Sequence, residues 1–99
     1  MIKHVILWKI KEDLPQKESH KLLAKQALEG LKGKIDGLID ITVNTSPLPT
    51  SNCDMMLDSS FESFEALKAY AIHPLHQAAA DNFVRPITCD RVCMDYEVE

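Results

Sequence analysis

The sequence predicts an α+β fold, in which a four-stranded antiparallel sheet carries its helices on one face. Two patterns predict this fold. Four short segments alternate apolar and polar residues, as strands do, and segments with apolar residues every three or four positions lie between them. Their order along the chain is β-α-β-β-α-α-β. The chain has 99 residues, too few for two hydrophobic cores, so we expect residues 1–99 to form a single domain.

The first predicted strand, residues 2–10, has one apolar face and a second face that is apolar in its middle and cationic at its ends. One face carries Ile2, His4, Ile6, Trp8 and Ile10, and the other carries Lys3, Val5, Leu7 and Lys9. A strand with one solvated face would have polar residues in the middle of that face. Because the few predicted helices can cover only one side of the sheet, we expect a second copy of the chain to cover the other side.

The next predicted elements are a helix, a strand, a loop and a second strand. The helix spans residues 15–33, where leucine and alanine recur at three- and four-residue steps. A strand at residues 38–45 and a strand at residues 53–60 flank a polar loop at residues 46–52, whose prolines prevent strand pairing. On the strand at 38–45, alternation places on one face Ile39, Ile41 and Val43.

Two short helices and a last strand complete the pattern. The second helix follows Ser63, a good N-cap, and runs to His73, where Pro74 interrupts the helical hydrogen bonds. Pro74 suits the first position of a third helix that ends near residue 84. Residues 88–98 predict the last strand, with Val92, Met94 and Tyr96 on the face opposite Cys93 and Asp95. This order is the ferredoxin-like, split β-α-β arrangement.

Composition excludes several classes of partner. The net charge is −4, and the lysines of the first third alternate with acidic residues, which is typical of a solvated helix face and not of a nucleic-acid-binding stripe. The apolar run at the N-terminus is too short for a signal peptide or a membrane span, so we expect a cytoplasmic protein. The three cysteines form no CxxC motif; Cys89 and Cys93 are expected on one face of a strand about 13 Å apart, so neither a disulfide nor a zinc site is predicted.

No metal site or cofactor is predicted. The aspartates that could suggest a hard cation are spread over two strands without the spacing of a ligand loop. They are Asp54, Asp58, Asp90 and Asp95. Asp95 is expected to serve packing and the pairing of the last strand.

Four segments resemble the stress-responsive A/B barrel family (dimeric α/β barrel, Dabb), in the expected order and spacing. They are HVILWK at 4–9, FESFEALKAY at 61–70, HPLH at 73–76 and VCMDYE at 92–97. The resemblance implies a homodimer whose two sheets face each other to close a barrel. It also implies a pocket between each sheet and its own helices.

The resemblance further implies candidate site residues. In a plant polyketide cyclase of this family, a cofactor-free enzyme, the general base and an assisting tyrosine lie in a Tyr-x-x-His-Pro-x-His string, which matches His76 and Tyr70 here. A pocket histidine of that enzyme matches His4. An imidazole such as His76 can take an acidic α-proton near neutral pH, and a phenol can hydrogen-bond the oxyanion that develops. The remaining predicted substrate-binding residues are Ile6, Trp8 and His73.

A second interpretation assigns the same string to the corner between two helices. His73 would then cap the preceding helix, and His76 would hydrogen-bond a carbonyl or Tyr70. Two functions therefore stay open. One is a cytoplasmic homodimer that binds a small apolar or aromatic metabolite, with cofactor-free proton-transfer or cyclase chemistry. The other is a stress-associated structural or ligand-carrying dimer without catalysis. Haem or monooxygenase chemistry has no support beyond topology.

Overall fold

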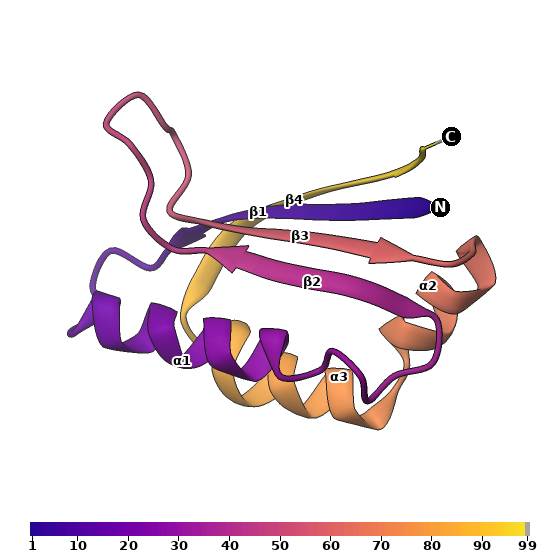
Figure 1. Cartoon of the computed structure of the whole chain (residues 1–99). Helices are drawn as coiled ribbons and strands as arrows, with labels where there is room; N and C mark the ends of the chain where they lie inside the picture. The colour runs from indigo at the N-terminus through magenta and orange to yellow at the C-terminus, as the bar shows by residue number, and fades with distance from the viewer. Residues whose placement is uncertain (99) are drawn as a thin grey trace.

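A four-stranded antiparallel sheet forms the centre of the molecule in the computed structural model, which describes residues 1–98 (Figure 1). The strands stand in the order β2-β3-β1-β4. Their bounds are Ile2–Ile10 for β1, Leu38–Asn44 for β2, Met55–Phe61 for β3 and Thr88–Glu97 for β4. The helices lie on one side of the sheet, with α1 at Lys17–Glu29, α2 at Phe64–Ala71 and α3 at Pro74–Ala79. This confirms the predicted α+β, ferredoxin-like arrangement.

Helix α1 is shorter than the helix predicted at residues 15–33. It begins at Lys17 because Gln16 has left-handed backbone angles, with φ at 54°. Beyond the helix, Leu31 N–H donates to the carbonyl of Leu28, three residues back, which ends the α-helical hydrogen-bond ladder. Within the described part of the chain, no helix is both long and apolar enough to cross a membrane.

The third predicted helix, residues 74–84, consists of two parts. Helix α3 ends at Ala79 and continues as the π-helical turn η1, Ala80–Val84. Arg85 N–H donates to the carbonyl of Ala80 at 2.8 Å, a five-residue step that widens this last turn. The strand ends differ from the predicted ones by two residues at most.

Strand β1 supplies the floor of the hydrophobic core. The predicted inner face is confirmed: His4, Ile6, Trp8 and Ile10 are buried against the helices. On β2 the alternation is wrong for one residue. The β2–β3 pairing shifts between Leu38 and Asp40, and this irregularity leaves Ile39 44% exposed while its neighbour Leu38 is buried.

The lysines of α1 are not all solvated, contrary to the prediction. Lys21 is buried and its Nζ donates to the carbonyl of Thr45 at 2.8 Å. Lys25 Nζ donates to the carbonyl of Val43 at 2.7 Å, and the Glu29 carboxylate accepts the N–H of Val43 at 2.9 Å. Burial disfavours the Glu29 carboxylate, but the hydrogen bonds from Lys25 and Val43 outweigh it and lower the pKa of Glu29. Three side chains of α1 thus bind the backbone of the β2 end.

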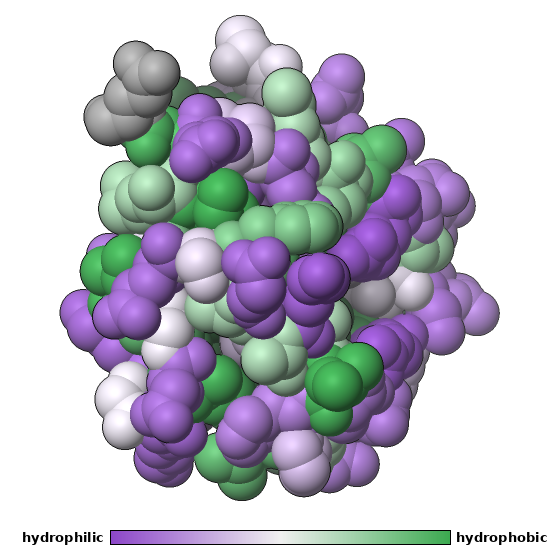
Figure 2. All heavy atoms as spheres, turned by 90° about the vertical axis from the view of Figure 1, so that its right-hand side faces the viewer, coloured by the Kyte–Doolittle hydropathy of each residue, from purple (hydrophilic) through white to green (hydrophobic). Residues whose placement is uncertain are grey.

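The face of the sheet that points away from the helices, here called the outer face, carries apolar side chains. Cross-strand pairs share a face, and β1 pairs Val5 with Met94 and Leu7 with both Met56 and Val92. Met94 is 67% exposed. By contrast, the end of the molecule at α2 and the two chain termini is mostly hydrophilic, with hydrophobic residues in separate patches (Figure 2). The outer face is therefore the apolar surface that the two-sided pattern of β1 predicts.

Two glycines with positive φ offer a matched test of packing between α2 and the turn before β2. Gly37 has φ +86°, and a Cβ there would lie 2.5 Å from the Cβ of Ala66; Gly33 has φ +83° and open space around it. We expect Gly33→Ala to cost about 1–2 kcal/mol for the left-handed backbone alone. Gly37→Ala is expected to cost about 1–3 kcal/mol more, because Ala66 sits in the required space. Urea unfolding of both variants measures the difference in the free energy of unfolding. An equal decrease in both would show that α2 moves away from a Cβ at residue 37 without a loss of stability.

Candidate functional site

A cavity of about 570 Å³ lies between the inner face of the sheet and the helices. Ile6 and Trp8 from β1 and Leu57 from β3 contribute apolar walls, so the cavity suits an apolar or aromatic body. Its lining also includes cationic side chains, namely Lys68, Arg85 and Arg91. Arg85 is ion-paired with Asp81, four residues earlier.

Tyr70 is the most buried polar group of the cavity. Ser63 caps α2 by accepting the Ala66 N–H at 3.1 Å, and the helix then places Tyr70 against the sheet, where its ring lies 4.9 Å from that of Phe61. The side chain is 1% exposed, and its hydroxyl has no hydrogen-bond partner among the described residues. Burial raises the pKa of Tyr70 far above its usual value. The phenol therefore stays protonated and is available to donate.

His76 lies beside Tyr70 at the start of α3. The centroids of the two rings are 4.2 Å apart, with 37° between their planes. His76 Nδ1 lies 3.2 Å from the carbonyl of Ala71, which can only accept, so Nδ1 carries the hydrogen and Nε2 carries the lone pair. Burial lowers the pKa of His76, the hydrogen bond to Ala71 offsets this in part, and the nearby cations Arg85 and Arg91 lower the pKa further. A neutral imidazole with a basic Nε2 thus stands at the cavity.

His73 does not line the cavity. Its Nδ1 accepts the N–H of Leu75 at 3.1 Å and so caps α3, the helix that follows. The suggestion that it caps the preceding helix was wrong. The reason is that Pro74 requires an extended backbone at His73, and that conformation suits an N-cap.

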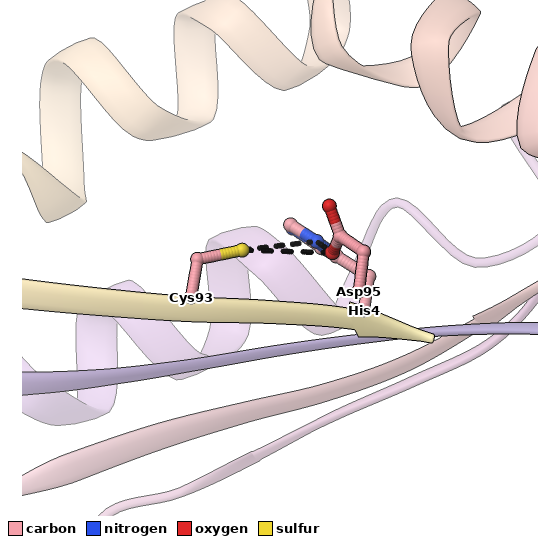
Figure 3. A group of neighbouring side chains, drawn as sticks. All are labelled: His4, Cys93 and Asp95. Carbon is pink, nitrogen blue, oxygen red and sulfur yellow. Dashed lines mark hydrogen bonds and ion pairs between the residues drawn. The ribbon is translucent and has the colours of Figure 1, made fainter. Parts of the chain in front are cut away.

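His4 points from β1 into the cavity and meets two side chains of β4 (Figure 3). His4 Nδ1 lies 2.5 Å from Asp95 Oδ1. Cys93 Sγ lies 3.7 Å from the same nitrogen and 3.5 Å from the same oxygen. Partial burial raises the pKa of the Cys93 thiol, and the Asp95 carboxylate raises it further. Asp95 is thus a residue of the cavity, which the sequence interpretation missed when it assigned Asp95 to strand packing.

A signal for Asp95 was present in the alternation of β4. Val92, Met94 and Tyr96 match the apolar outer face, so the intervening Cys93 and Asp95 had to face the helices. The same alternation does not extend to Cys89. Because the β1–β4 pairing is irregular between Leu7 and Lys9, Cys89 pairs with Lys9 while Cys93 pairs with Ile6. This irregularity interrupts the regular strand on which the predicted spacing of the two cysteines rests, although both cysteines line the same cavity.

Comparisons with known proteins give consistent results. The sequence model of the Stress responsive A/B Barrel Domain matches residues 2–98. An uncharacterised protein of Streptomyces coelicolor is 32% identical over 80 residues, which cover 79% of this chain and 81% of that protein. A dimeric protein of unknown function from Bacteroides fragilis, with a ferredoxin-like fold, superposes with a TM-score of 0.89 at 32% identity, over 98% of this chain and 95% of that one. A hydroxynitrile lyase from Passiflora edulis superposes with a TM-score of 0.75 at 17% identity, over 99% and 93% of the chains, and this likeness shows a common fold alone.

The lowered pKa of His76 predicts a pH dependence of stability. The unfolded chain binds a proton at His76 near its ordinary pKa of 6.5, whereas the folded chain resists that proton until a lower pH. The free energy of unfolding should therefore fall as the pH drops through about 6.5 and below. In His76→Gln this contribution is absent, so the variant should lose less stability between about pH 7.5 and about pH 5.5. Chemical unfolding of both proteins at the two pH values measures the change in the free energy of unfolding. An identical change in the wild type and in His76→Gln would contradict a lowered pKa of His76.

Proposed function

The chain belongs to the stress-responsive A/B barrel domain family, and on that premise we propose that it is a homodimer that binds a small carbonyl compound with an apolar or aromatic body and catalyses cofactor-free proton transfer. The observation that carries the proposal is the pairing of a neutral His76 with the buried, unpartnered hydroxyl of Tyr70 at one cavity. The two groups supply a base and a hydrogen-bond donor, which are the two requirements of enolisation.

The proposed reaction uses each group in the protonation state that its surroundings favour. His76 Nε2 takes a proton from the carbon next to the substrate carbonyl and becomes an imidazolium. The electron pair moves to the carbonyl oxygen, and Tyr70 donates a hydrogen bond to the enolate oxygen that results. The imidazolium then returns the proton, either to carbon or, after the enolate carbon attacks a second carbonyl, to the new alkoxide. The Ala71 carbonyl holds the base in the required tautomer throughout.

A ligand-carrying dimer without catalysis is the second candidate. It is favoured by the hydrogen bond from His76 to Ala71, because that bond also closes the corner between α2 and α3 and so gives His76 a structural use. This candidate needs the cavity and Trp8, but it does not need the lone pair of His76. The two candidates therefore differ in the effect of replacing His76.

The homodimer is supported by the outer face and by the dimeric relative from Bacteroides fragilis. Val92, Met94 and Tyr96 are exposed on this face and continue the apolar middle of β1. Two copies that pack their outer faces together would remove this surface from water and close a barrel. We also place the protein in the cytoplasm, because its three cysteines are unpaired, as is usual in a reducing compartment.

Catalysis is tested by proton exchange. Wild-type protein is mixed in D₂O with a panel of aryl ketones and aryl β-dicarbonyls, and deuterium uptake at the α-carbon is followed by NMR. We expect His76→Gln to slow the catalysed exchange by about 100-fold or more, since a positioned base contributes at least that much. Tyr70→Phe should slow it by roughly 100-fold while leaving the fold intact.

Binding is measured on the same samples through the fluorescence of Trp8, the one tryptophan of the chain, which lines the cavity. His20→Gln, on α1 and outside the cavity lining, is the matched control and should behave as the wild type. Exchange that His76→Gln leaves unchanged would exclude His76 as the base. A panel that quenches Trp8 without any exchange above the buffer rate would identify the ligand-carrying dimer instead.

The proposed dimer through the outer face is tested by placing a charged residue on that face. Met94→Glu places a carboxylate in the middle of the outer face, and desolvation of that charge in the dimer should shift the protein to a monomer at micromolar concentration. Ile72→Glu is the control, because Ile72 is 78% exposed at the C-terminal end of α2, away from the outer face. Light scattering after size-exclusion chromatography gives both masses. A dimeric Met94→Glu, or a monomeric wild type, would refute the proposed interface.

A further inference from the structure

We propose that His4, Cys93 and Asp95 form a binding site for one divalent transition-metal ion of the zinc type (Figure 3). The three side chains rise from adjacent strands toward the helices, and their ligand atoms lie within 4.8 Å of one another. The site shares the cavity with His76 and Tyr70 but includes neither of them.

The spacing of the three atoms is close to that of a tetrahedral site. With metal–nitrogen and metal–oxygen distances of about 2.1 Å and a metal–sulfur distance of about 2.3 Å, tetrahedral geometry separates sulfur from each other ligand atom by about 3.6 Å. The observed separations of Cys93 Sγ are 3.7 Å to His4 Nδ1 and 3.5 Å to Asp95 Oδ1. The nitrogen and oxygen are 2.5 Å apart and hydrogen-bonded, so they would have to separate by about 1 Å. A small rotation of the Asp95 carboxylate supplies this movement, because Asp95 is an exposed side chain.

Strand pairing holds the three residues in this arrangement. His4 pairs directly with Asp95, and Ile6, two residues along β1, pairs with Cys93. All three side chains therefore stand on the inner face of two paired strands, and the irregular part of the β1–β4 pairing begins beyond them, after Leu7. Ligands on adjacent strands of a sheet need little ordering on binding, which favours affinity.

The ligand types select the class of metal. A thiolate and an imidazole suit Zn²⁺ and its neighbours in the first transition row, whereas Mg²⁺ and Ca²⁺ prefer sites made of oxygen alone. The deprotonated Cys93 and Asp95 together carry two negative charges, which a divalent ion neutralises. Three protein ligands leave a fourth tetrahedral position, and the cavity that Tyr70 lines lies on the same side of the sheet. The site thus has the composition of an open metal centre and not of a closed structural one.

The experiment titrates the purified 99-residue chain, stripped of metal with a chelator, with Zn²⁺ and separately with Co²⁺. Calorimetry should give one Zn²⁺ per chain, and thermal unfolding should shift to higher temperature as Zn²⁺ is added. Co²⁺ should produce a near-ultraviolet thiolate-to-cobalt charge-transfer band, which requires a cysteine ligand. In Cys93→Ser the band should vanish and Zn²⁺ affinity should fall by at least about tenfold, since even partners outside the coordination sphere contribute that much.

Cys89→Ser is the matched control. Cys89 is an exposed thiol on the same strand and also lines the cavity, but it lies outside the three-residue cluster, so this variant should keep the band, the affinity and the thermal shift. Circular dichroism checks that both variants fold. The proposal is overturned if Co²⁺ gives no charge-transfer band, if Cys89→Ser loses the band as Cys93→Ser does, or if Zn²⁺ binds Cys93→Ser as tightly as the wild type. The last result would show that the bound Zn²⁺ does not use Cys93 as a ligand.

Discussion

The pairing of β1 with both of its neighbours is the constraint on which the rest of the molecule depends. The inner face of β1 forms the floor of the cavity, and the outer face of β1 continues the apolar surface of β4 and β3. On the β3 side, Ser59 Oγ donates to the carbonyl of His4 at 2.8 Å and so holds β1 in place near the site. The β4 side brings Asp95 opposite His4. A slip of one residue would exchange the two faces of β1 and turn His4, Ile6 and Trp8 out of the cavity.

The buried polar groups of the cavity destabilise the folded chain, whereas apolar groups in their place would not. Leaving a buried hydroxyl such as that of Tyr70 without a partner costs about 1–3 kcal/mol. Beside it, His76 is held neutral with its Nδ1 bound to a carbonyl, so its second nitrogen is kept as an acceptor. A donor and an acceptor that are unused by the fold, and that lie next to each other in a cavity with apolar walls, are suited to a ligand that carries an oxygen.

Local sequence patterns predicted the elements of the fold well, and they failed where the contact is long-range or the strand is irregular. Alternation identified β1 and both of its faces, and the Pro74 break identified the junction of α2 and α3. The irregular pairing beside Ile39 changed which face that residue occupies, and a second irregularity interrupts β4 near Cys89. The strict two-residue period contains no sign of such irregularities. The bond between His4 and Asp95 joins residues 91 positions apart, so it required the strand register as well as the pattern. Tyr70, His76 and His4 were found through the family resemblance. The mixed set of His4, Cys93 and Asp95 was missed because the cysteines and the aspartates were each considered as metal ligands separately.

The contacts of α1 with the end of β2 have a consequence for how the sheet can associate. Strand β2 is an outermost strand, and such strands present unpaired backbone groups that can recruit another strand. Here Lys21, Lys25 and Glu29 already occupy the carbonyls of Thr45 and Val43 and the N–H of Val43. These side chains make the hydrogen bonds that a neighbouring strand would make, and so they block the pairing of another strand with this end of β2. Among the described residues, no side chain of α1 binds the backbone of β4, the outermost strand at the opposite edge, so that edge lacks this protection.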